Sequence, residues 1–455
     1  MKRALLLNPP GRLRYLRDYF CSTVSKAGYY WHPGDLLLQS GHFAAAGYDV
    51  TVLDCIASGI GPEDALARIR ALAPEAILSL VSASSWPEDL PFLERVHRDT
   101  GATILASGEI FLDRARPVLE ANPFLAGCLF DFTSADPVRF LAGARDVTSM
   151  AYREGQEIVV KRVDARGPFE IPVPLHERFP LDRYSMPGVP TRRWASLLTN
   201  YGCPFPCDFC NSCTFGFSWR EPANVELECQ RLRELGIRHV FIKDMTFAAK
   251  KAHGLAILDV LERHPFTHHC WCRVDLIDDE VALRMKRAGF LLVQFGVESG
   301  SAEILKKHGK RYAPEQVENA FAILAKHGIA AGAHFVLGLP GETPDTVEQT
   351  IALASRLPAL YASFNVFSPR HGTPLREEAI ARGLIDPLAT LDSSVMTPMA
   401  SQAGFTVEEL ERYRKQAYRR FYLRPGYLAS HLARPQTWRN HAVLGLGLMR
   451  NLIAN

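Results

Sequence analysis

The sequence of 455 residues lacks any long uninterrupted run of apolar residues. No window approaches the roughly 18 apolar residues that a membrane-spanning helix needs. The apolar start at residues 4–7 is broken by Asn8-Pro9-Pro10-Gly11, which makes it too short for a secretory signal peptide. We therefore expect no membrane partner and a cytoplasmic location.

An excess of charge of one sign is also missing. Lys and Arg number 52 against 49 Asp and Glu, so the net charge is +3. Nucleic-acid-binding chains usually show a basic patch or excess, so we expect no nucleic-acid partner. The hydrophobic content of 47% is typical of a globular protein, and the length allows two or three domains with sizeable cores.

The cysteines do not form a disulfide framework. The ten cysteines are scattered, which favours a reducing compartment, except for Cys203, Cys207 and Cys210 in a C-x3-C-x2-C array. A second C-x2-C pair is absent, and Cys213 is awkwardly placed as a fourth ligand, so structural zinc is the weaker alternative. Three thiolates are one fewer than a four-iron cluster needs, which leaves one iron open for a small chelating ligand.

This array resembles the cluster motif of the radical S-adenosylmethionine (SAM) superfamily. The resemblance includes Phe209 directly before the third cysteine and the strand expected at residues 194–199, and it covers roughly residues 190–385. It implies a [4Fe-4S] cluster held by Cys203, Cys207 and Cys210, whose open iron chelates SAM. Reductive cleavage of SAM would then give a 5′-deoxyadenosyl radical that abstracts hydrogen from a small-molecule substrate. The electron donor implied is a flavodoxin, a ferredoxin or a dedicated reductase.

Strand and helix signals alternate along the chain, which predicts an α/β protein with two parallel units. Over residues 1–145 the rhythm predicts a doubly wound Rossmann-like sheet. Residues 146–190 are rich in proline and are expected to form a linker. Residues 191–385 predict six βα units of a partial (β/α)6 TIM-type barrel, with chemistry at the carboxyl ends of its strands. Residues 386–455 predict a short helical tail that ends in a helix at 441–452.

The predicted strand ends carry polar residues, and the family resemblance implies SAM contacts there. Asp244 stands where the family meets the SAM amino group, although the common G-G-E form is absent. Arg273 suits the SAM carboxylate through a bidentate fork. Glu298 and Ser299 resemble the contact to the ribose or amino group, and Gly338 opens the turn that approaches the adenine. Phe209 is counted with these cofactor-binding residues. The alternative for the charged residues is a strand-end charge facing water.

The first domain resembles the cobalamin-binding domains that precede some radical SAM barrels. Domains that ligate cobalt through the protein carry D-x-H-x-x-G, and here the run Asp54 to Gly59 places Ile56 at the histidine position. An alkyl side chain has no lone pair for cobalt. Either cobalamin binds without a protein axial ligand or the pocket is vestigial, so cobalamin stays open as a cofactor.

Three further features carry two interpretations each. The aromatic insertion at residues 17–34 either roofs a substrate cavity or packs the two domains together. The run from His268 to Cys272 looks like metal ligation, but alternate strand residues point to opposite faces, which favours core or barrel lining. His334 is assigned to a core imidazole, with a substrate contact as the alternative.

The function expected first is radical dehydration, deoxygenation or rearrangement of a biosynthetic intermediate. An aminosugar in an antibiotic or other natural-product pathway is one such substrate, by resemblance to radical SAM diol dehydratases. The alternative is a cobalamin-dependent radical C-methyltransferase. Two remote alternatives are a tRNA methylthiotransferase, which would need three further cluster cysteines and a basic tail domain, and a cobalamin-binding sensor.

Overall fold

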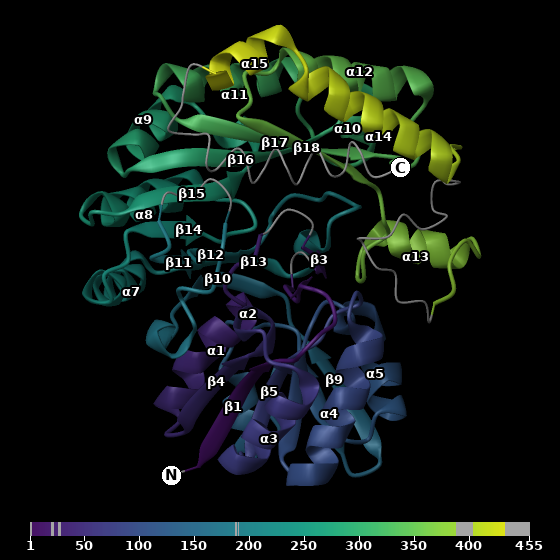
Figure 1. Cartoon of the computed structure of the whole chain (residues 1–455). Helices are drawn as coiled ribbons and strands as arrows, with labels where there is room; N and C mark the ends of the chain where they lie inside the picture. Colours follow the sequence, from purple (N-terminus) through teal and green to yellow (C-terminus); the bar gives the residue numbers. More distant parts are fainter. Residues whose placement is uncertain are drawn as a thin grey trace.

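The protein is described by a computed structural model over residues 2–19, 22–25, 29–186, 189, 191–387 and 404–432. In Figure 1 an N-terminal unit, purple to blue, lies below a teal-to-green unit, and the strands β10, β12 and β13 lie between them. The helix expected at residues 441–452 falls outside the described residues. Among those residues no helix has both the length and the apolar character needed to cross a membrane.

The N-terminal unit is built on a seven-stranded sheet of order β4-β1-β5-β6-β7-β8-β9. Its first five strands are parallel, and β1 is buried from Ala4 to Asn8, as expected of a strand covered on both faces. The strands are β1 (Arg3–Asn8), β4 (Asp49–Asp54), β5 (Ala76–Leu80), β6 (Thr103–Ser107), β7 (Leu125–Leu129), β8 (Ser149–Glu154) and β9 (Glu157–Arg162). The helices are α1 (Gly34–Ala45), α2 (Cys55–Ser58), α3 (Pro62–Leu72), α4 (Trp86–Thr100), α5 (Phe111–Ala121) and α6 (Asp136–Leu141).

The segment 146–190 is not the plain linker that the sequence predicted. Strands β8 and β9 lie within it and extend the N-terminal sheet in antiparallel fashion. A further strand, β10 (Ala165–Phe169), pairs with β13 (Gly216–Arg220), which follows the cysteine loop. The prediction was wrong here because the prolines of the segment begin only at Pro168, after the two sheet strands have ended.

The second unit carries six parallel strands in chain order, as the sequence predicted for a partial (β/α)6 barrel. These strands are β11 (Trp194–Leu197), β14 (His239–Ile242), β15 (Thr267–Cys272), β16 (Phe290–Glu298), β17 (Ala330–Leu337) and β18 (Tyr361–Val366). The helices between them are α7 (Pro222–Glu234), α8 (Lys251–Glu262), α9 (Asp279–Arg287), α10 (Ala302–Lys307), α11 (Pro314–Lys326) and α12 (Pro344–Arg356). Three helices follow, α13 (Pro374–Ala381), α14 (Val407–Tyr422) and α15 (Pro425–Leu432), the last two coloured yellow in Figure 1.

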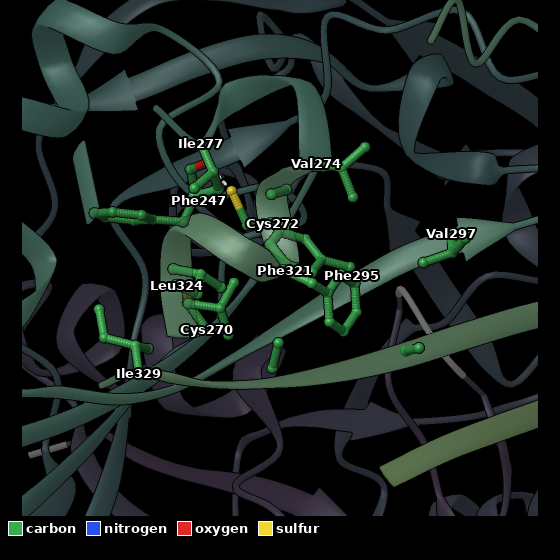
Figure 2. Close-up of a cluster of buried hydrophobic side chains, with 14 of the residues drawn as sticks. Phe247, Cys270, Cys272, Val274, Ile277, Phe295, Val297, Phe321, Leu324 and Ile329 are labelled. Carbon is green, nitrogen blue, oxygen red and sulfur yellow. Dashed lines mark hydrogen bonds between the residues drawn. The ribbon is translucent and has the colours of Figure 1, made fainter. Parts of the chain in front are cut away.

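The core of this unit lies between the strands and their helices. Figure 2 shows Cys270 and Cys272 of β15 among Phe295, Phe321 and Leu324, and all five side chains are buried. The thiol of Cys272 donates to the carbonyl of Phe247. The run at residues 268–272 therefore sends its two cysteines into the hydrophobic core, away from any shared metal site with its histidines.

The aromatic insertion joins the two units. Tyr19 packs against Phe215 near the cysteine loop, with ring centroids 5.3 Å apart. Trp31 packs edge-on against Trp271 of β15 at 5.9 Å and lies 6.4 Å from Phe241 of β14. The interpretation of this insertion as a domain-packing cluster is confirmed by these contacts, and a role over a substrate stays a prediction.

Candidate active site

The cysteine loop runs from β12 (Asn200–Gly202) to the short helix η2 (Asn211–Thr214). It begins with a close approach to β13, because Gly202 has φ +78° and a Cβ there would clash with the carbonyl of Gly216. The amide of Cys203 donates to the same carbonyl at 3.1 Å. Cys207 is buried, whereas Cys203 and Cys210 are partly exposed. The three predicted ligands thus stand on one short loop that is anchored to β13, and their role as cluster ligands stays a prediction.

Cys213 is turned toward the backbone of this loop. Its thiol donates to the carbonyls of Cys207 and Cys210, at 3.5 and 3.1 Å. Among the residues that the structure describes, no three His, Cys, Asp or Glu side chains converge as the ligands of a single metal ion do. The thiol of Cys213 is thus engaged by the backbone of its own loop.

Asp244, at the end of β14, holds the entry to the cysteine loop. Its buried carboxylate accepts hydrogen bonds from the amides of Thr199 and Asn200, at 2.6 and 3.0 Å, and from both of their side chains. Burial raises the pKa of Asp244 to about 7, and these donors lower it in part. The predicted contact of this carboxylate to the SAM amino group stays a prediction.

Arg273, directly after β15, lies beside the cysteine loop. Its Nε and Nη2 donate to the two carboxylate oxygens of Asp275, at 3.0 and 2.9 Å, and Nη2 also donates to the carbonyl of Lys310 at 2.8 Å. The remaining nitrogen, Nη1, lies 3.7 Å from the sulfur of Cys207. The Nε–Nη2 edge of Arg273, predicted to bind the SAM carboxylate, is therefore occupied by Asp275. The contact of Arg273 to the SAM carboxylate remains a prediction.

Glu298 ends β16 in a left-handed conformation with φ +65°, where the pairing of β16 with β17 shifts register. Its carboxylate pairs with Lys310 at 2.9 Å, and Lys310 also donates to the carbonyl of Gly296. Burial lowers the pKa of Lys310, but Glu298 opposes this and the net shift is upward. Ser299 instead faces Thr350 of α12. The left-handed backbone at Glu298 therefore directs its partly buried carboxylate to the buried ammonium of Lys310 at the strand end, while Ser299 is turned away.

Gly338 opens the turn after β17 with φ +85°. A Cβ there would lie 2.8 Å from Leu410 of α14, and the amides of Gly338 and Leu339 donate to the buried carboxylate of Glu342. Burial raises the pKa of Glu342 to about 7. Glycine is required here by both backbone conformation and packing. The adenine contact predicted for Gly338 is not tested by this geometry.

The segment at residues 308–312 was missed by the sequence analysis. His308 bridges Asp208 of the cysteine loop, at 2.9 Å, to the carbonyl of Pro340, at 3.0 Å, and its ring lies edge-on to Phe209. Gly309 has φ +76°, and a Cβ there would clash with the carbonyl of Pro206. The one available signal was the glycine between His308 and Lys310, just before α11.

The side chain of His334, on β17, contacts residues of the neighbouring strands β16 and β18. Its ring contacts Gln294 and Tyr361 through Nε2, at 3.3 and 3.2 Å, and Ser363 through Nδ1 at 2.8 Å. Burial lowers its pKa. The imidazole has three partners on two neighbouring strands, β16 and β18, as expected of a satisfied internal histidine.

Comparisons with known proteins agree with this geometry. A family model described as the radical SAM superfamily matches residues 197–354, which include the cysteine loop and five of the six strands that form the barrel sheet, β11 in part. An uncharacterized methyltransferase from Pyrococcus horikoshii is 28% identical over 84% of this chain and 86% of its own. The anaerobic magnesium-protoporphyrin IX monomethyl ester cyclase of Rubrivivax gelatinosus is 24% identical over 92% of this chain and 78% of its own.

Two solved structures share the fold across both units. TsrM from Kitasatospora setae, a radical SAM methyltransferase solved with cobalamin and a [4Fe-4S] cluster, superposes with a TM-score of 0.67 at 21% identity and covers 84% of this chain and 78% of its own. The cobalamin-dependent radical SAM enzyme OxsB gives a TM-score of 0.63 at 16% identity, over 78% of this chain and 52% of its own. The matched domain implies a [4Fe-4S] cluster and SAM as cofactors. Residues 197–354 therefore form a radical SAM domain, and the chain shares its fold with TsrM and OxsB across both units.

Proposed function

We propose that the protein transfers a methyl group from SAM to a carbon atom of a small molecule. The observation that carries this proposal is the Pyrococcus relative, which is named a methyltransferase and aligns along most of both chains. TsrM, which shares both units, is also titled a methyltransferase and was solved with tryptophan as substrate. These comparisons favour the methyltransferase alternative over the dehydration, deoxygenation or rearrangement that the sequence analysis placed first.

The residues of the loop and strand ends have distinct tasks in this proposal. Cys203, Cys207 and Cys210 hold the cluster, which when bound supplies the electron that cleaves SAM. Glu298 offers a carboxylate for the hydroxyl or ammonium donors of SAM, and Lys310 fixes that carboxylate from behind. Phe209 of the cysteine loop packs edge-on to His308 of the segment 308–312 and against a small apolar cluster, which would limit access of water to the loop.

Cobalamin would occupy the crevice at the carboxyl ends of the N-terminal strands, where a doubly wound sheet binds its ligand. Asp54, at the end of β4, accepts hydrogen bonds from Asn8, Tyr30 and Tyr184, at 2.9–3.0 Å, and from the amide of Ala57. Tyr30 and Tyr184 stack with centroids 5.8 Å apart. The carboxylate at the motif position is thus fully used by the protein.

A second set of side chains fills the other half of this crevice. Arg17 from the insertion is fully buried and pairs with Asp89 of α4 at 2.6 Å. It also donates to Asn8 and to the carbonyl of Pro9, at the end of β1. Ile56 has no lone pair for cobalt. The residues present therefore do not fit a corrinoid, and we derive no step through one. This crevice favours a second candidate function, a radical dehydration or rearrangement that needs no corrinoid.

One experiment separates the two functions. Anaerobically reconstituted protein is given a reductant, candidate pathway intermediates and SAM with a trideuterated methyl group, and products are read by mass spectrometry. A product that gains the trideuteromethyl group supports methyl transfer. Deoxyadenosine together with a dehydrated or rearranged product that carries no label refutes it and supports the second candidate. A flavodoxin, a ferredoxin or a dedicated reductase as electron donor, and a natural-product or antibiotic pathway, stay parts of the proposal.

A further inference from the structure

The guanidinium of Arg273 is fixed by partners on three sides. Asp275 takes the Nε and Nη2 edge, and the carbonyl of Lys310 takes the other side of Nη2. The plane also lies over the ring of Phe205, with Cζ 3.8 Å from its centroid. The remaining nitrogen, Nη1, is directed at Cys207 of the same loop and lies 3.7 Å from its sulfur. A group held this firmly loses little entropy when it contacts that sulfur.

The segment His308–Tyr312 packs against the cysteine loop beside the guanidinium of Arg273. Gly309 approaches the backbone of Pro206 and Cys207 so closely that no side chain would fit. Lys310 adds a second buried cation, 5.9 Å from the ring centroid of Phe209, and Tyr312 ties the segment to the carbonyl of Gly296 at 2.7 Å. Cys207 therefore sits in a rigid setting with a directed N–H donor and two cations nearby, each of which is also paired with a carboxylate.

We propose that Arg273 is a positioning residue for the cluster, which donates a charge-assisted hydrogen bond to the Cys207 thiolate and thereby raises the reduction potential. The reduced cluster carries one more negative charge than the oxidised cluster, so a cation and a donor at a ligand sulfur stabilise the reduced form more. The proposal rests on the cluster of the proposed function and deepens it, because it assigns Arg273 to electron acceptance rather than to the SAM carboxylate.

The test is a redox titration of the reduced-cluster electron paramagnetic resonance signal, without SAM. We compare the wild type, Arg273→Gln, Arg273→Lys and the control Arg263→Gln, whose exposed guanidinium pairs with Glu226 at 2.6 Å. We expect the Gln variant to be reduced about tenfold less readily, which is about 59 mV for one electron. The Lys variant should recover part of this shift, and the control should show none.

Two outcomes overturn the proposal. The first is an unchanged potential in Arg273→Gln together with a raised KM for SAM, which would assign Arg273 to the SAM carboxylate instead. The second needs no variant: wild-type protein labelled with ¹⁵N-arginine should show hyperfine coupling between the reduced cluster and a guanidinium nitrogen, and its absence refutes the contact even where the Gln variant takes up no cluster. If the wild type binds no cluster, the proposed function is refuted as well. If it binds a cluster but shows no coupling to a guanidinium nitrogen, only the proposal for Arg273 is refuted.

Discussion

Replacement of Arg17 should show how much its ion pair with Asp89 in the N-terminal crevice contributes to the stability of the fold. The side chain is fully buried and pairs with Asp89, whose side chain is also fully buried, at 2.6 Å. In Arg17→Ala the carboxylate of Asp89 keeps its bonds from Ser85 and the amide of Ser82 but loses its only counter-charge among the described residues. Breaking a buried pair from one side costs about 3–5 kcal/mol. We expect the free energy of unfolding to fall by that amount.

The same reasoning predicts how the loss depends on pH. Burial raises the pKa of Asp89, and Arg17 opposes that shift. Without Arg17 the carboxyl would take up a proton more readily, so the destabilisation should shrink as pH is lowered. The apolar pair Arg17→Met with Asp89→Leu leaves no orphan charge and should recover most of the loss.

The assay is urea unfolding followed by circular dichroism at neutral and mildly acidic pH. The control Arg70→Ala removes a half-exposed guanidinium from Asp99 and should cost about 1 kcal/mol or less. A loss in Arg17→Ala as small as in this control would refute the view that Arg17 seals the crevice.

Three further predictions follow from the same contacts. Gly309→Ala should lower the iron and sulfide bound per chain, because its Cβ would push the cysteine loop at Pro206; an unchanged content would contradict this close approach. Ile56→His should not create corrinoid binding, since the crevice is filled, and a bound corrinoid spectrum in that variant would reopen the cobalamin pocket. The free energy of unfolding of Glu342→Gln should rise relative to that of the wild type as pH rises from about 4 to about 7, because the variant lacks one of four carboxyls whose pKa burial raises to about 7 and whose bound proton stabilises the folded state at lower pH; a pH-independent difference in urea titrations would refute it. These carboxyls are Asp35, Glu109, Asp244 and Glu342.

The barrel strands and helices were predictable because their signals are local. Six βα units were expected over residues 191–385, and the structure shows such strands as β14 (His239–Ile242) and such helices as α11 (Pro314–Lys326) there. Both have an apolar pattern with clear boundaries. The strands β8 and β9 were missed because their place in the sheet depends on the pairing of β8 with β7. The proline content of the segment gives no information on such a pairing.

The cysteine loop was predictable for a different reason. Its chemistry requires three thiols at short spacing, so Cys203, Cys207 and Cys210 stand out in one dimension. The partners of the loop come from far along the chain. His308 meets Asp208 across 100 residues, and Arg273 meets Cys207 across 66. Such contacts depend on how parallel strands bring their carboxyl ends together, which spacing in the sequence does not reveal.

The central claim is that this loop binds a cluster that breaks down SAM. Its most direct test is the amount of deoxyadenosine released by reduced, iron-loaded protein, measured for the wild type and for Cys207→Ala. We predict release by the wild type and none by the variant. Equal release from both, or none from a fully loaded wild type, would contradict the account.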